Sequence, residues 1–253
     1  MIQRIFSRWL TLPESHSKTT TLRIPRLGTI AYPAVVALTL LPLLGSARAY
    51  GLPIPYASSF EENLFPFWTK TTVFGSISRT ADVAYDGTHA LKFQSASGGD
   101  RKIAIQHRFV NPTKGTVSIA FYDAAPGQET LYEQLSIANS MVPGSLVAVG
   151  TMDFDSNCYT AYMVSASGQT IGPNANCGIY PQESTTPVKR IAGWHVLTIS
   201  VGQSATEIAI DGQIVFAGPV YSFDTIRFQV SGPSWRPDTT AYIDSFSFNP
   251  LSY

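Results

Sequence analysis

The chain has 253 residues, of which 13% are charged, and it holds 17 Lys+Arg and 17 Asp+Glu. Beyond residue 49 there are 11 basic and 16 acidic residues, so that part has a formal charge of 11 − 16 = −5. An acidic chain is poorly suited to nucleic acid, whose binding requires a basic face. Its 204 residues fit one domain.

The first 49 residues have the pattern of a secretory signal peptide. A basic region is followed by an apolar run from Ile30 to Leu44, and Ala47-Arg48-Ala49 then fits the small-x-small cleavage pattern. The alternative is a membrane anchor, but the run is shorter than the ~20 residues of a spanning helix. We therefore expect cleavage after Ala49 and a mature chain of residues 50–253 with no membrane span. Such a chain would be secreted, either extracellular or periplasmic.

Apolar residues alternate with period two after residue 50, and helical periodicity is almost absent. For example, Val117, Ile119 and Phe121 share one face of a strand, and Ile226 and Phe228 share a face of another. The expected strands lie near 73–79, 90–94, 103–110, 116–122, 131–138, 146–152, 159–164, 194–201, 206–210, 213–217, 223–230 and 241–248. About a dozen short strands separated by glycine-containing turns indicate a β-sandwich or barrel.

Two cysteines, Cys158 and Cys177, are present. In an exported protein two cysteines usually pair, and such a bridge would stabilise the fold by roughly 3 kcal/mol on the chain-entropy model. The alternative is a metal site, which two cysteines without a nearby histidine would make poorly. We expect a disulfide.

A Trp-His pair begins the expected strand at 194–201, and Asp211-Gly212 lies between two further strands. Asp-Gly is typical of a type I′ hairpin turn, which requires positive φ at both positions. His195 shares its strand face with Leu197 and other apolar residues, so we interpret it as a hydrogen-bonded residue at the edge of the core rather than a catalytic base. His107 follows the same pattern.

The stretch "AGWHVLTISVGQSATEIAIDGQIVF" resembles the Trp-His strand and "DG" hairpin of laminin-G/concanavalin-A-like jelly rolls. The segments "SFEENLFPFW" and "AYDGTHALKF" are similar to the opening of bacterial carbohydrate-binding modules with that fold, and "AYIDSFSF" is similar to their last strand. The resemblance covers most of residues 56–249. It implies an all-β fold, a two-sheet antiparallel jelly-roll β-sandwich, in which one concave sheet often holds a glycan.

In the carbohydrate-binding modules that the chain resembles, acids on the first and last strands hold a structural Ca²⁺. The matching residues are Glu61 and Asp244, with the Asp86-Gly87 turn as a further contributor. Strand alternation places Asp244 on one face with Tyr242, Phe246 and Phe248, and a carboxylate buried there must be paired or bind a metal. The alternatives are an ion pair of Asp244 with Arg79 or Lys92, or a strand orientation in which Phe246 faces solvent.

Some proteins with this fold are glycoside hydrolases or polysaccharide lyases. The laminarinase-type glucanases carry Glu-x-Asp-x-x-Glu on one strand, and this motif is absent here. The nearest substitutes are Asp153 with Asp155, which we interpret as a solvated loop edge, and Glu129 with Glu133.

A glycan site needs aromatic platforms and a few polar partners. The candidates are Trp235 in a proline-flanked loop, Tyr122 and Trp194, with Arg227 and Gln229 projecting from the non-core face of a strand. Trp68 is expected in the core. Our first expectation is an exported, non-catalytic carbohydrate-binding or surface-adhesion module. The alternatives are a glycoside hydrolase or polysaccharide lyase of the same fold, or a structural envelope or matrix protein.

Overall fold

The computed structural model describes residues 55–62, 67–128, 130–152, 155–173, 177 and 185–252. The expected signal peptide and its cleavage site after Ala49 lie outside these residues, as do Glu129 and Asp153. Asp155 is described by its backbone only. No helix in the described part of the chain is long and apolar enough to cross a membrane.

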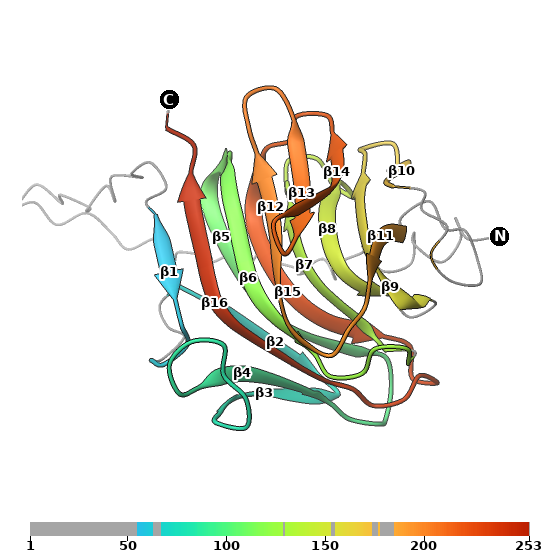
Figure 1. Ribbon diagram of the computed structural model, residues 1–253. Helices are drawn as coiled ribbons and strands as arrows, with labels where there is room; N and C mark the ends of the chain where they lie inside the picture. Colours follow the sequence, from blue (N-terminus) through green and yellow to red (C-terminus); the bar gives the residue numbers. More distant parts are fainter. Residues whose placement is uncertain are drawn as a thin grey trace, which may run out of the picture. The chain divides into compact units, whose positions relative to one another are not determined.

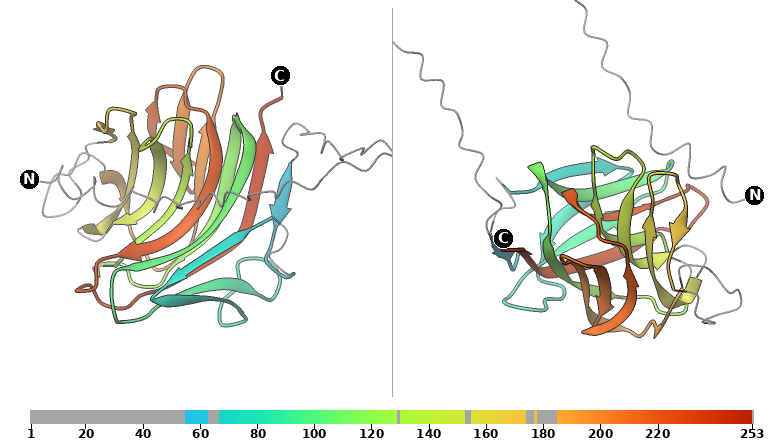
Figure 2. Two further views of the ribbon diagram at one scale, coloured as in Figure 1. Left: turned by 180° about the vertical axis from the view of Figure 1, so that it is seen from behind. Right: turned by 90° about the horizontal axis from the view of Figure 1, so that it is seen from above.

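The described residues form strands and no helix, arranged in two antiparallel sheets packed face to face (Figures 1 and 2). Sheet A has the order β14-β13-β12-β6-β16-β4-β3, with β1 paired to β16. Its strands are β14 (Gln213–Gly218), β13 (Thr206–Ile210), β12 (Gly193–Val201), β6 (Gly115–Asp123), β16 (Thr240–Pro250), β4 (Ala90–Ser95), β3 (Gly75–Thr80) and β1 (Tyr56–Ser58).

Sheet B has the order β10-β9-β8-β7-β15-β5-β2, with β11 paired to β9. Its strands are β10 (Thr170–Ile171), β9 (Asp155–Val164), β8 (Leu146–Met152), β7 (Tyr132–Ala138), β15 (Phe223–Gly232), β5 (Arg101–Thr113), β2 (Thr69–Val73) and β11 (Thr185–Lys189). The core lies between the sheets, where the period-two pattern of each strand places its apolar residues. Trp68 is buried there as expected, with 1% of its surface exposed.

The strand expected near 73–79 is β3, but the sequence missed β2, which ends at Val73 and lies in the other sheet. β2 pairs with β5 in sheet B, and β3 pairs with β4 in sheet A. Phe74, between them, has a φ of 51°. A left-handed residue turns the chain from one layer to the other, and hydrophobic alternation alone does not reveal such a turn.

The hairpin expected at Asp211-Gly212 is confirmed. Both residues have positive φ, 51° and 78°, and they join β13 to β14. The Asp211 carboxylate also accepts a hydrogen bond from the Val196 backbone N–H at 2.7 Å and lies 2.7 Å from His195 Nδ1. His195 is buried and its Nε2 lies 2.9 Å from the Ile191 carbonyl oxygen, so it is the hydrogen-bonded core-edge residue that the sequence indicates.

The expected orientation of Asp244 is wrong. Asp244 lies opposite Ala120 of β6, and the register shifts before Ser247, at a bulge where Ser245 has a φ of 43°. The extra residue turns Phe246 toward the core while Asp244 stays on the outward face of sheet A. Asp244 is nevertheless fully buried, because it accepts hydrogen bonds from the backbone of residues 85 and 86, which cover it.

The disulfide between Cys158 and Cys177 is confirmed, with their Cα atoms 6.0 Å apart. It joins β9, at the margin of sheet B, to residue 177, 19 positions further along the chain. A structural disulfide indicates that the protein matures in an oxidising compartment.

Candidate functional site

The outward face of sheet B is organised in rows that run across the strands. Strand register places Gln106 (β5), Arg227 (β15), Ser136 (β7), Ala148 (β8) and Tyr162 (β9) side by side in one row. Neighbouring strands are ~4.8 Å apart, so the strands of Arg227 and Tyr162 are separated by roughly 14 Å. The two positions between them hold small side chains, which leaves a groove flanked by two large ones.

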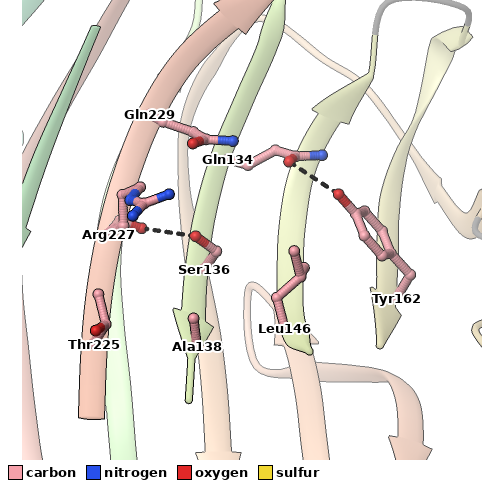
Figure 3. Close-up of a pocket in the computed structure, with 8 residues that line it drawn as sticks. All are labelled: Gln134, Ser136, Ala138, Leu146, Tyr162, Thr225, Arg227 and Gln229. Carbon is pink, nitrogen blue, oxygen red and sulfur yellow. Dashed lines mark hydrogen bonds between the residues drawn. The ribbon is translucent and has the colours of Figure 1, made fainter. Parts of the chain in front are cut away.

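A second row lies beside the first and consists of Ala104 (β5), Gln229 (β15), Gln134 (β7), Gly150 (β8) and Thr160 (β9). Members of these two rows, together with Thr225, Ala138 and Leu146 of a third row, line a pocket of about 60 Å³ (Figure 3). Its lining consists of Gln134, Ser136, Ala138, Leu146, Tyr162, Thr225, Arg227 and Gln229. The structure thus confirms that Arg227 and Gln229 project away from the core, and it brings them together.

Arg227 is the principal charge of the pocket. One of its terminal nitrogens, Nη2, donates to Gln106 Oε1 at 3.0 Å, while its buried Nε has no hydrogen-bond partner among the described residues. No Asp or Glu in the described part of the chain forms an ion pair with it. Burial lowers the pKa of Arg227, since removal from water disfavours the charged form. A guanidinium that faces a pocket and has no anionic partner among the described residues is suited to receive an anion.

The hydroxyl of Tyr162 is held over strand β7 by a short relay of hydrogen bonds. Gln134 donates through Nε2 to the Thr151 carbonyl oxygen at 3.3 Å, which leaves its Oε1 to accept from the Tyr162 hydroxyl at 3.2 Å (Figure 3). The ring of Tyr162 crosses the small residues of β8 and its oxygen therefore lies one strand from Arg227. Burial raises the pKa of Tyr162 to about 12.

The face divides into an apolar and a polar half. On the β8–β9 side Ala148, Met152 and Tyr162 form a buried apolar cluster that is separate from the core, with Leu146 and Val164 packed against it. On the β7–β15–β5 side amides and cations predominate, including the exposed Lys102 and Arg108. Sugars present apolar C–H faces and polar hydroxyl rims, so such a division suits a glycan.

Neither of the two rows around the pocket contains a carboxylate. Glu133, a candidate for hydrolysis, points from β7 into the interior, where 3% of its surface is exposed and Oε1 accepts a hydrogen bond from Thr239 Oγ1 at 2.6 Å. Burial raises the pKa of Glu133 to about 7. Asp224, at the beginning of β15, is bound to Ser140 and lies 4.0 Å from Arg108. Asp155 lies opposite Met152 at the beginning of β9.

The three aromatic candidates lie elsewhere. Tyr122 and Trp194 are neighbours on the outward face of sheet A, with ring centroids 5.3 Å apart, on the opposite side of the sandwich from Arg227. Trp235 lies in the loop between β15 and β16 and has 79% of its surface exposed. Ligand contact by these three residues stays a prediction, and they do not form one site with Arg227 and Gln229.

The two acids expected to bind Ca²⁺ are held by hydrogen-bond donors. Glu61 Oε1 accepts from the backbone N–H groups of Thr88 and His89 at 2.5 and 2.7 Å, and Asp244 Oδ2 accepts from those of Tyr85 and Asp86 at 2.8 and 3.0 Å. N–H groups that point at a carboxylate oxygen compete with a cation, which requires six to eight oxygen ligands. In the described residues no three His, Cys, Asp or Glu side chains gather in a metal-binding group. These acids therefore do not fit Ca²⁺ well, and calcium at Glu61 and Asp244 stays a prediction.

Comparison with known proteins agrees with this architecture. No protein-family model matches the chain, and no curated protein matches it in sequence. Solved structures do match. The cellulose-induced protein Cip1 matches 77% of this chain and 96% of its own, with a TM-score of 0.54 and 13% identity. The laminarinase catalytic domain from Thermotoga maritima matches 76% of this chain and 96% of its own, with a TM-score of 0.51 and 12% identity. The Crh5 transglycosylase matches 79% of this chain and 85% of its own, with a TM-score of 0.52 and 16% identity.

The fold is a concanavalin-A-like jelly roll. The expected fold class and the resemblance are therefore confirmed, and at these identities the likeness itself shows the fold alone. Our first functional expectation, a non-catalytic carbohydrate-binding or adhesion module, is wrong: a laminarinase and a transglycosylase are among the solved chains of this fold that match, which supports the catalytic alternative instead.

Sequence reasoning missed Tyr162, Gln134, Ser136 and Gln106. Each lies on the non-core face of an alternating strand, so its orientation was available from the pattern. The missing information was strand order, because β15 pairs with β5 and β7, which are distant in the sequence. Only that pairing brings Arg227 between Gln106 and Ser136.

Proposed function

We propose that this protein is an exported enzyme that cleaves glycosidic bonds in a polysaccharide bound across the outward face of sheet B. The observation that carries the proposal is the groove between Arg227 and Tyr162. It combines an apolar half, a polar half and a hydroxyl group capable of proton transfer. The disulfide and the expected signal peptide support export, and the matching laminarinase and transglycosylase support action on a polysaccharide.

The geometry provides for binding a polymer. The pocket lies on the outward face of a sheet of eight strands and its lining comes from four adjacent strands, so a chain could lie across those strands above it. The apolar side, with Leu146 and Tyr162, would contact C–H faces, while Gln134, Gln229 and Arg227 would bind hydroxyl or charged substituents. Because these groups come from four adjacent strands, β15, β7, β8 and β9, they are held by a rigid scaffold rather than by loops.

Cleavage of a glycosidic bond requires a group that protonates the departing oxygen. Tyr162 carries the one hydroxyl of a titratable side chain among the described pocket residues, since the guanidinium of Arg227 keeps its proton. Its hydrogen bond to Gln134 fixes the position of the hydroxyl oxygen. Tyr162 is therefore assigned the proton-transfer role.

The test is incubation of the purified protein with a panel of neutral and acidic polysaccharides, with new reducing ends measured over time. Release of reducing ends by the wild type, and loss of that release in Tyr162→Phe, would support the proposal. Binding without any new reducing ends on every polymer of the panel would contradict it.

A further inference from the structure

We infer that the groove recognises a carboxylated sugar, a uronate residue within a polysaccharide, and cleaves the chain by β-elimination rather than by hydrolysis. This inference rests on the proposed function and specifies its substrate class and reaction. Three features of the outward face of sheet B carry it: the unpaired Arg227, the size of the pocket, and the absence of carboxylates from the two rows that line it.

Arg227 is the first feature. Its position is costly in the free protein, because a guanidinium that has lost part of its water and has no anionic partner is poorly solvated. The guanidinium of Arg227 and the amides of Gln134 and Gln229, which line the same pocket, provide donors for a planar anion there. A carboxylate matches the planar fork of a guanidinium, whereas a hydroxyl of a neutral sugar leaves the charge uncompensated.

The pocket is the second feature. Its volume of about 60 Å³ would hold about four water molecules, if each requires ~15 Å³. That is enough for a substituent such as a carboxylate and too little for a whole sugar ring. The ring would therefore lie above the small side chains of Ser136 and Ala148, with its carboxylate inserted toward Arg227.

The third feature is the chemistry that the lining permits. Hydrolysis by the retaining route needs two carboxyl groups about 5 Å apart. Neither described row around the pocket contains one, and Glu133, next to Gln134 on β7, faces the core instead. Elimination needs no such pair. It needs a cation or amides on the carboxylate, which make the neighbouring C–H acidic, and one group that moves a proton.

The reaction balances with the groups present. The Tyr162 oxygen, as phenolate, takes the proton from C5 beside the carboxylate, and the electrons of that C–H bond form the C4=C5 double bond. The bond from C4 to the glycosidic oxygen breaks, and that oxygen takes the proton back from Tyr162. One product gains a reducing end and the other an unsaturated uronate, with no water, oxidant or reductant consumed. Arg227 stabilises the charge that develops on the carboxylate.

The test uses matched polymers: polyuronates of several sugar configurations, each in its native form and with its carboxylates chemically reduced to alcohols. We expect the full-length protein to cut at least one native polyuronate, with one conjugated C=C bond, seen by ultraviolet absorbance, for each new reducing end. Its carboxyl-reduced counterpart should remain intact. We also expect Arg227→Gln to lower kcat/KM on the native polymer by 100-fold or more.

Arg79→Gln is the matched control, since Arg79 is an exposed arginine on β3 of sheet A, away from the pocket, and it should leave kcat/KM unchanged. Denaturant unfolding of both variants would verify that they fold. Reducing ends without C=C bonds, or equal cutting of native and carboxyl-reduced polymer, would overturn elimination and leave the proposed function intact. No reducing ends from any polymer, neutral or acidic, would contradict the proposed function itself.

Discussion

The two outward faces of the sandwich are built from similar strands but differ in how their polar groups are satisfied. On sheet A, neighbouring hydroxyls bond to each other, as Ser118 does to Thr198 at 2.9 Å and Thr116 to Ser200 at 3.2 Å. On sheet B, the guanidinium of Arg227 retains a donor without a partner and faces a pocket. Polar groups that are satisfied within the fold stabilise it, and those left open are available to a ligand.

The aromatic residues of the two faces show the same contrast. Register aligns Tyr242, Tyr122 and Trp194 across three strands of sheet A, where each ring contacts the next, at centroid distances of 6.0 and 5.3 Å. Such cross-strand pairs stabilise a sheet. Tyr162 on sheet B instead has small residues beside it in its row, and its hydroxyl extends over them. Thus Tyr162, whose neighbours are small, lines the candidate site, whereas the aromatic residues of sheet A contact one another.

The largest expected effect would separate the two faces directly. Tyr162→Phe removes one hydroxyl from the groove, and loss of a proton-transfer group lowers kcat by roughly 100-fold or more. Tyr122→Phe removes a hydroxyl from sheet A and should leave kcat unchanged. Steady-state kinetics on the cleaved polysaccharide measures both. Equal activity of the two variants would show that the assignment of the site to sheet B is wrong.

The pH dependence of the wild type sharpens the role of Tyr162. Because its pKa is raised to about 12, only a small fraction of the side chain is phenolate at neutral pH. If elimination requires the phenolate, kcat should rise by about tenfold per pH unit from neutral toward alkaline pH, as far as the fold remains intact. A flat profile would contradict the role of Tyr162 as the base.

The next effect concerns Glu133, which lies in the interior behind the groove, and the pH dependence of stability. The pKa of Glu133 is raised from 4.5 to about 7 in the folded protein, so the folded state binds this proton more tightly than the unfolded state. The protonated Glu133 therefore contributes fully to the free energy of unfolding below pH 4.5. As the pH rises from 4.5 to 7, the free energy of unfolding falls by roughly 3 kcal/mol. Glu133→Gln should therefore flatten this part of the pH profile of the unfolding free energy, measured by denaturant titration. Parallel profiles for wild type and variant would contradict the buried assignment.

The smallest effect concerns sheet A. Asp244→Asn retains the shape of the side chain but removes one acceptor from a group that receives N–H bonds from Tyr85, Asp86 and Ser245. An unsatisfied buried donor costs about 1–3 kcal/mol, so the unfolding free energy should fall by that amount while kcat is retained. Asp82→Asn, at an exposed pair with Lys92, is the matched control and should change stability by less than ~1 kcal/mol. If Asp244→Asn lowered kcat without lowering the unfolding free energy, the assignment of a structural role to sheet A and of the site to sheet B would be wrong.

The sequence by itself determined the layer structure. Period-two alternation predicted the core faces of β6 and β15, the Asp211-Gly212 pair predicted its hairpin, and two cysteines predicted the disulfide. These predictions are confirmed because each depends on local backbone geometry or, for the two cysteines, on a pairing with few alternatives. The orientation of Arg227 and Gln229 away from the core belongs to the same class.

Only the tertiary structure decided which of these residues meet. A bulge at Ser245, which no sequence pattern indicated, turned Phe246 into the core and left Asp244 on the outward face. The positive φ of Phe74 separated β3 from β2, which lies in the other sheet. Strand order placed Tyr122 and Trp194 on one side of the sandwich, and Arg227 with Tyr162 on the other. The physical reason is that alternation gives the direction of a side chain relative to its own strand, while its neighbours are set by pairing between strands far apart in the sequence.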